Sequence, residues 1–166
     1  DTNPELPGFG GFDHAIVYVA GPEPLWIDAT AQYTRVGALP LGDQGRLALI
    51  AAGGTTALVR TPEAASADNG GVHTVEVQLA EFGRAEFRET VEATGSGETA
   101  LRTLYGTLEP AKLKETLERE AKQSYLATAL GDYSLTPGDD FSRPFQLTVS
   151  ASNCARGNTM DDQAVV

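Results

Sequence analysis

Two short apolar runs on either side of a glycine and proline cluster constrain the fold of this chain most strongly. The first run is residues 14–19 (HAIVYV), the cluster is residues 20–24 (AGPEP), and the second run is residues 25–28 (LWID). This pattern predicts a β-hairpin. Positions 14 and 28 have residue 21 as their midpoint, and Gly21 lies in the cluster. We therefore expect His14 and Asp28 to face each other across two antiparallel strands, with Cβ atoms about 4.5–5.5 Å apart.

A carboxylate that faces an imidazole can fix the orientation and the tautomer of the ring, which is the supporting half of a nucleophilic triad. His14 and Asp28 are therefore the candidate catalytic residues. The more common role of a histidine beside an aspartate is a structural pair, and spacing alone does not separate the two roles. The third member of a triad, a nucleophile, has no obvious place in this chain.

The one cysteine, Cys154, lies after both candidate residues. Triads recur with different chain orders, so nucleophilic use of Cys154 stays open as the less favoured alternative. A free cysteine near a terminal strand is more often a small apolar filler. A single cysteine also excludes an intrachain disulfide and a thiolate metal site. His73 is too far along the chain from His14 to suggest a metal-ligand spacing, so we expect no metal and no cofactor.

The charge balance excludes several kinds of partner. The chain has 166 residues with 12 Lys and Arg against 23 Asp and Glu, which gives a net charge of -11. Binding to nucleic acid or to anionic lipid needs clustered basic residues, so neither is expected. No run approaches the ~20 apolar residues of a membrane span. The first residues lack the pattern of a signal peptide and an initiator methionine, which suggests a mature fragment or a piece of a longer protein.

The rest of the chain reads as mainly β with one helix. A second hairpin is expected around Gly53-Gly54, residues 61–71 read as a linker, and residues 72–152 form a β-rich domain, with a further strand from Thr99 to Tyr105. Leucines and alanines at helical spacing predict an amphipathic helix over about 110–130, opened by Pro110 and capped by Gly131. Residues 153–166 read as a loose tail.

Three residues near the first hairpin have two interpretations each. Trp26 shares strand parity with Asp28, so it either shields the candidate pair from water or belongs to the core, and we favour the core. Asp43 and Arg46 lie in a glycine-flanked loop. A structural ion pair between them is the simpler interpretation, and a substrate-facing loop edge is the other.

The quoted segments resemble a known family. Residues 12–19 (FDHAIVYV) followed by 26–30 (WIDAT) resemble the histidine and aspartate strands of transglutaminase-like proteins. Residues 42–49 (GDQGRLAL) through 59–62 (VRTP) look like a bacterial branch of that superfamily. The resemblance implies that residues 1–60 are the last strands of a transglutaminase/papain-like core, and that residues 72–152 are a β-sandwich-like C-terminal domain. It covers most of the chain, but the second half is weak in motifs.

The resemblance also implies a chemistry. In the superfamily a cysteine upstream of the histidine attacks an amide, the residue matching His14 acts as base, and the residue matching Asp28 orients it. No cysteine precedes His14 here, so we expect this chain to be inactive alone and to need a missing upstream segment as partner. The expected substrate is a protein or peptide, in hydrolysis or acyl transfer. The family's bacterial members look exported, which favours a periplasmic or cell-surface setting.

A different class of function fits the same sequence. The chain is alternatively a non-catalytic β module that binds a protein or peptide by adding a strand to a sheet edge. Exposed strand faces and edges also predict homodimerisation or strand exchange.

Overall fold

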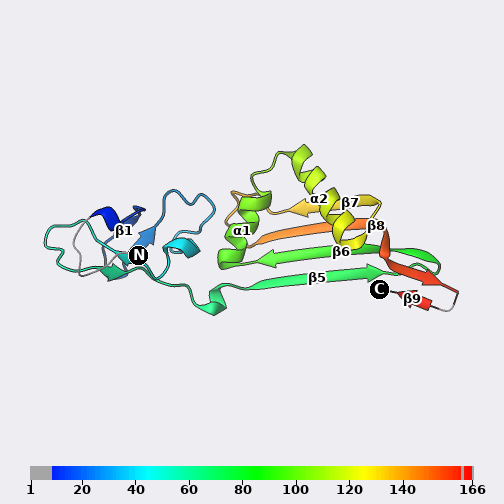
Figure 1. The fold of residues 1–166 in the computed structure, drawn as a ribbon, viewed down its shortest axis with the longest axis horizontal. Helices are drawn as coiled ribbons and strands as arrows, with labels where there is room; N and C mark the ends of the chain where they lie inside the picture. Colours follow the sequence, from blue (N-terminus) through cyan, green and yellow to red (C-terminus); the bar gives the residue numbers. More distant parts are fainter. Residues whose placement is uncertain (1–8, 162, 166) are drawn as a thin grey trace. The chain divides into compact units, whose positions relative to one another are not determined.

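The computed structural model describes residues 9–161 and 163–165. The chain divides into two compact units between Asn69 and Gly70, inside the segment predicted as a linker (Figure 1). The described part is mainly β with a few helices, as predicted, and none of its helices is long and apolar enough to cross a membrane.

The first unit consists of short elements joined by loops. It holds two two-stranded antiparallel sheets, β1 with β2 and β3 with β4, and three single-turn 3-10 helices. The bounds of these elements are η1 Phe9–Gly11, β1 Val17–Val19, β2 Leu25–Ile27, η2 Leu41–Asp43, β3 Leu47–Ala48, β4 Val59–Arg60 and η3 Ser66–Asp68. Both predicted hairpins are present. The second is centred on Gly53-Gly54 as predicted, because Leu47 pairs with Arg60 and Ala48 with Val59.

The centre of the first hairpin differs from the prediction by one residue, which shifts the strand pairing by two. Val17 pairs with Ile27, Tyr18 with Trp26 and Val19 with Leu25, so the hairpin is centred on Pro22 rather than on Gly21. β1 begins only at Val17, so His14 lies before the strand and is not directly opposite Asp28. Turn geometry sets hairpin register. Here Pro22, and not Gly21, lies at the centre of the turn.

The second unit is one antiparallel sheet with two helices. Its elements are β5 Gly71–Gln78, β6 Gly83–Ala93, α1 Gly95–Tyr105, α2 Pro110–Tyr125, β7 Ala129–Leu135, β8 Phe145–Met160 and β9 Gln163–Val165. The strand order is β5-β6-β8-β7, and β9 pairs with the end of β8. Both helices lie over the same face of the sheet (Figure 1). The expected β-sandwich is therefore wrong for the described residues: helices, not a second sheet, cover the apolar face.

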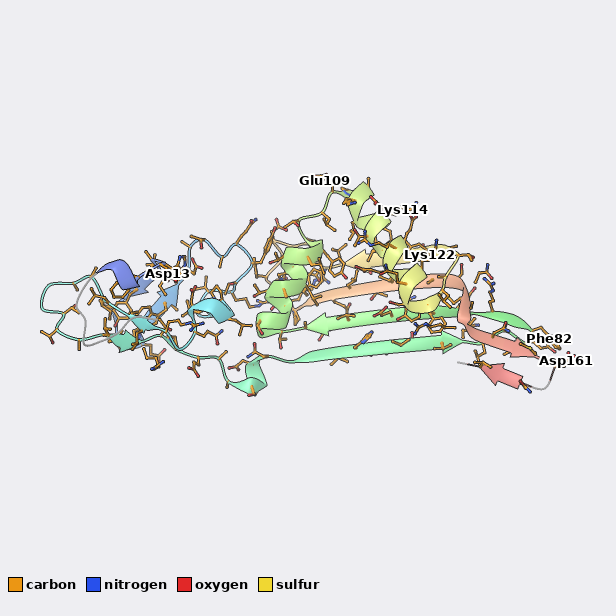
Figure 2. The ribbon with its side chains drawn as sticks, in the orientation of Figure 1. Asp13, Phe82, Glu109, Lys114, Lys122 and Asp161 are labelled. Carbon is orange, nitrogen blue, oxygen red and sulfur yellow. The ribbon has the colours of Figure 1, made fainter. Side chains whose placement is uncertain are left out.

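The core of the second unit follows from strand alternation. On β6 the residues Ala85, Phe87 and Ala93 are buried on the helix-covered face, whereas Arg84, Glu86 and Arg88, at the alternate positions, are exposed. Leu113 and Leu117 from α2 pack on Phe145 and Leu147 of β8. The turn that holds Phe82 and the turn that holds Asp161 lie at the same end of this sheet, and Glu109 stands at the start of α2 (Figure 2).

Three sequence predictions for this unit are wrong, one in the type of element and two in where helix α2 ends. Residues from Thr99 to Tyr105 form the second half of helix α1 instead of a strand. Helix α2 starts at Pro110 as predicted but ends at Tyr125, because Leu126 adopts a left-handed conformation with φ 52°. Gly131, the predicted cap, lies in β7.

The tail predicted as loose is the second half of β8, which runs to Met160. Its inward positions carry small residues, and Ala151, Cys154 and Gly157 are all buried. A Cβ added at Gly157 would lie 2.5 Å from the Cβ of Ala85, so glycine allows the two strands to approach closely. Small residues give no apolar alternation in the sequence, which is why this stretch did not read as a strand.

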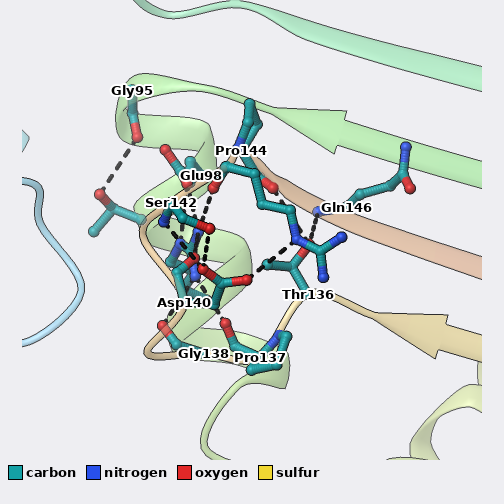
Figure 3. A network of polar contacts seen from close by, with 12 residues as sticks. Gly95, Glu98, Thr136, Pro137, Gly138, Asp140, Ser142, Pro144 and Gln146 are labelled. Atoms are coloured by element: carbon teal, nitrogen blue, oxygen red, sulfur yellow. Dashed lines mark hydrogen bonds and ion pairs between the residues drawn. The ribbon is translucent and has the colours of Figure 1, made fainter.

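A fully buried arginine ties α1 to the loop between β7 and β8 (Figure 3). Arg102 donates from Nε and Nη2 to Glu98 Oε1, at 3.0 and 2.8 Å. The guanidinium also donates to four loop carbonyl oxygens, those of Pro137, Gly138, Asp140 and Arg143. These bonds give the partly buried loop carbonyl oxygens a donor, so this network connects the loop to α1.

Candidate functional site

His14 and Asp28 meet in the first unit, as the sequence predicts. The imidazole Nε2 lies 3.3 Å from Asp28 Oδ2. The side chain of His14 is 39% exposed, whereas that of Asp28 is 6% exposed. His14 lies in the segment that leads into β1, and Asp28 directly follows β2. The hairpin therefore still brings the pair together, through the segments at its open end.

Thr30 holds the carboxylate of Asp28. Asp28 Oδ1 accepts from the Thr30 backbone N–H at 2.8 Å and from the Thr30 hydroxyl at 2.7 Å. These hydrogen bonds stabilise the charged form, so the pKa of Asp28 lies below its usual range, chiefly through Thr30 and with a smaller effect of His14. One oxygen is thus fixed by the local turn, and the other remains for the imidazole.

Asp43 is a second carboxylate that faces the same nitrogen. Its Oδ2 lies 3.9 Å from His14 Nε2. Burial, with a further effect of the nearby Asp28, raises the pKa of Asp43 above its usual range. The predicted ion pair of Asp43 with Arg46 is wrong for the described residues, since Arg46 Nε donates to the carbonyl oxygen of Gly42 instead.

A set of hydrogen bonds holds the loop that carries Asp43. The hydroxyl of Thr61, which is 4% exposed, donates to the Asp43 carbonyl at 2.5 Å and accepts from the Arg46 N–H at 2.8 Å. The Gln44 amide bridges the Leu39 carbonyl oxygen and the Ala64 N–H. Thr61 falls in the segment predicted as a linker because a Thr-Pro dipeptide is typical of a turn, and no local pattern indicates a contact 15 to 18 residues away.

Replacing Thr61 by valine is expected to destabilise the first unit by about 1–3 kcal/mol, because the Arg46 N–H and the Asp43 carbonyl oxygen lose their partner in a buried position. Trp26 is the only tryptophan of the chain and lies in β2, so urea unfolding followed by its fluorescence reports the first unit. The matched control is Thr55→Val at an exposed position, which should change stability by less than about 0.5 kcal/mol. Equal effects of the two changes would contradict the role given to Thr61.

The opposite pKa shifts of the two carboxylates predict opposite effects of removing their charge. The lowered pKa of Asp28 stabilises the fold above the unfolded-state pKa, and this contribution is lost as the pH falls through the folded-state pKa. The raised pKa of Asp43 costs stability at neutral pH, and the cost disappears as the pH falls below it. At pH 7 we expect Asp43→Asn to raise, and Asp28→Asn to lower, the unfolding midpoint seen by Trp26 fluorescence. Shifts of the same sign would refute this assignment.

Both carboxylate contacts of His14 involve Nε2, and neither involves the other ring nitrogen, Nδ1. In the described part of the chain no hydrogen bond to Nδ1 is found. The side chain is 39% exposed, so solvent reaches part of the ring.

The remaining predicted residues lie elsewhere. Cys154 is completely buried in the core of the second unit, and burial raises the pKa of its thiol, so it has the character of an apolar filler and not of a nucleophile. His73 lies in the second unit beside Glu89, with Nε2 2.6 Å from Glu89 Oε1. Trp26 packs against Tyr18, with ring centroids 4.8 Å apart.

His14, Asp28 and Asp43 also offer a set of ligand atoms that could coordinate a divalent cation. One ligand atom from each lies within 4.8 Å of the others. An imidazole nitrogen with two carboxylate oxygens suits Zn²⁺. The acidic groups already have the imidazole as partner, so the arrangement does not require an ion.

Comparisons with protein-family models, with curated proteins and with solved structures found no match for this chain. The resemblance to transglutaminase-like proteins therefore rests on the quoted sequence segments alone, residues 12–30, 42–49 and 59–62.

Proposed function

We propose that His14 and Asp28 are the base and its orienting carboxylate in a transglutaminase-like, thiol-dependent reaction at amide bonds. The observation that supports this most is the contact of Asp28 with Nε2 at 3.3 Å, on a His14 side chain that is 39% exposed and whose Nδ1 takes part in neither carboxylate contact. In this proposal the first unit is the end of a transglutaminase-like core, and the second unit is the domain that follows it. A thiol from a segment other than those described here completes the site.

The proposed reaction assigns one task to each group. Nδ1 of His14 takes the proton of the thiol, and the thiolate attacks the amide carbonyl carbon to form a tetrahedral adduct. Collapse of the adduct breaks the C–N bond, and the imidazolium returns its proton to the departing amine. Water or a second amine then attacks the thioester, with His14 again removing a proton and the thiolate leaving.

Asp28 and Asp43 support these steps electrostatically. The carboxylate of Asp28 holds the Nε2–H tautomer, which leaves a lone pair on Nδ1, and it stabilises the imidazolium once formed. Asp43, at 3.9 Å, adds a second negative group beside the same nitrogen. The resemblance implies a protein or peptide substrate, and the net charge of -11 disfavours polyanionic ones.

A small thiol tests the base directly. With 2-mercaptoethanol as acceptor and 4-nitrophenyl acetate as donor, we expect the chain to accelerate thioester formation about tenfold over its His14→Ala variant. His73→Gln is the matched control, because His73 is also an exposed histidine beside a carboxylate, and it should keep the full rate. An unchanged rate in His14→Ala would overturn the proposal.

Strand addition is a second candidate function, and the edge strand β5 favours it. β5 pairs with β6 alone among the described strands, and Val72 and Val75 are 62% and 42% exposed. An unpaired edge of this kind can receive another strand. We expect light scattering to show a mass above that of the 17.5 kDa monomer at high concentration, and Val72→Lys to restore the monomer. A monomer at every concentration would contradict self-association through β5.

A further inference from the structure

A small cavity lies in the second unit between its two helices and the sheet, separate from His14 and Asp28. Its volume is about 70 Å³. Most of its wall is apolar, with Leu101 from α1, Leu117 from α2, and Leu147 and Val149 from β8. Four polar side chains complete the lining, namely Glu89, Tyr105, Glu120 and Tyr125.

Glu89 is a charged residue on the mostly apolar face of the sheet. It has the same strand parity as Phe87 and Val91 on β6, so its side chain lies on the helix-covered face of the sheet. Its Oε2 accepts from the Tyr125 hydroxyl at 2.6 Å, and its Oε1 lies 2.6 Å from His73 Nε2. The Glu89 side chain is 28% exposed, and each of its oxygens has a polar partner.

Glu120 brings a second carboxylate to the same cavity. Its Oε2 accepts from the Tyr105 hydroxyl at 3.1 Å. Burial first, and then the charge of Glu120, raise the pKa of Tyr105 to about 12. Both phenols therefore remain neutral donors, and the cavity has two carboxylates and two aromatic rings in its wall.

No lysine or arginine forms an ion pair with either carboxylate in the described ranges, and His73 is the one basic side chain in contact. Two carboxylates without a lysine or arginine partner, beside aromatic rings, suit a cationic ligand. The leucine and valine wall suits a short alkyl chain.

We propose that this cavity binds a short primary alkylammonium group, with the ammonium between Glu89 and Glu120 and the alkyl chain against the leucines. The volume of 70 Å³ is several times the roughly 10–15 Å³ of cavity space that one water molecule needs, so the cavity suits a ligand of only a few non-hydrogen atoms. A free small amine and the end of a lysine side chain share this chemistry. The proposal does not depend on the role of His14.

The test uses the full chain and n-propylammonium chloride, followed by NMR of the leucine methyl groups. We expect saturable shifts of Leu117 and Leu147 with a Kd of about 1 mM. The neutral isostere 1-propanol should bind at least about tenfold more weakly, because it has no charge to pair with the carboxylates. An equal affinity for propanol, or shifts that do not saturate by ~50 mM amine, would overturn the proposal.

Two variants on one helix locate the site. Glu120→Gln should weaken n-propylammonium at least about tenfold by removing one carboxylate. Glu118→Gln changes the same residue type at an exposed position of α2 and should bind like the wild type. Equal affinities of Glu120→Gln and the wild type would overturn the assignment. Nα-acetyl-lysine methylamide then separates the sources: affinity equal to that of propylammonium supports a lysine side chain, and a much weaker affinity supports a free amine.

Discussion

Replacement of Arg102 by methionine is expected to lower the free energy of unfolding of the second unit by about 3–5 kcal/mol. The guanidinium is completely buried, and Glu98 is 2% exposed. Removing the arginine leaves the Glu98 carboxylate without the guanidinium in a low-dielectric site and removes the donor to four loop carbonyl oxygens. The ring of Phe141, whose centroid lies 4.6 Å from the guanidinium carbon, also loses its cation.

Urea unfolding followed by far-UV circular dichroism measures this change, since both described α-helices belong to the second unit. The matched control is Lys114→Met, because Lys114 and Glu118 form an exposed pair at 3.8 Å that should contribute less than about 1 kcal/mol. The double variant Arg102→Met/Glu98→Leu should recover part of the loss by removing the buried carboxylate. A loss in Arg102→Met no larger than that in Lys114→Met would contradict this account of the loop.

Replacement of Phe145 by alanine is expected to cost about 3–5 kcal/mol in the second unit. Phe145 is 0% exposed and packs on Leu113 and Leu117 of helix α2. Its ring also lies 5.6 Å from the guanidinium carbon of Arg102. The truncation therefore opens a cavity where the sheet, the helix and the buried arginine meet.

The same unfolding experiment applies, with Phe82→Ala as the matched control. Phe82 is 62% exposed, so its truncation should change stability by less than about 0.5 kcal/mol. Similar losses for the two phenylalanines would mean that the core is not centred on β8 and α2.

Local chemistry predicted much of this fold. The glycine and proline clusters predicted both hairpins of the first unit, and the leucine spacing with Pro110 predicted helix α2. Helix α1 was missed because Gly95-Ser96-Gly97 at its start reads as a turn. Arg102 connects this helix to loop carbonyl oxygens that lie 35 to 41 residues away and leave no local signal. Long-range contacts of this kind are outside the reach of pattern reasoning.

The candidate site was predicted in part for a related reason. The approach of His14 to Asp28 follows from the hairpin, although the centre of its turn is shifted by one residue. The approach of Asp43 depends on the hydrogen bonds that Thr61 makes to Asp43 and Arg46. Those contacts connect a loop to a residue across a second hairpin, so spacing around His14 contains no trace of them.

The central claim is that Asp28 holds the proton of neutral His14 on Nε2 and leaves Nδ1 bare. Long-range ¹H–¹⁵N NMR of the imidazoles tests it, in a His73→Gln background in which His14 is the only histidine. At the alkaline end of its titration we predict a single tautomer with a protonated Nε2, and a mixture of tautomers in the Asp28→Ala variant. A proton on Nδ1, or a tautomer that does not change in Asp28→Ala, would contradict the claim.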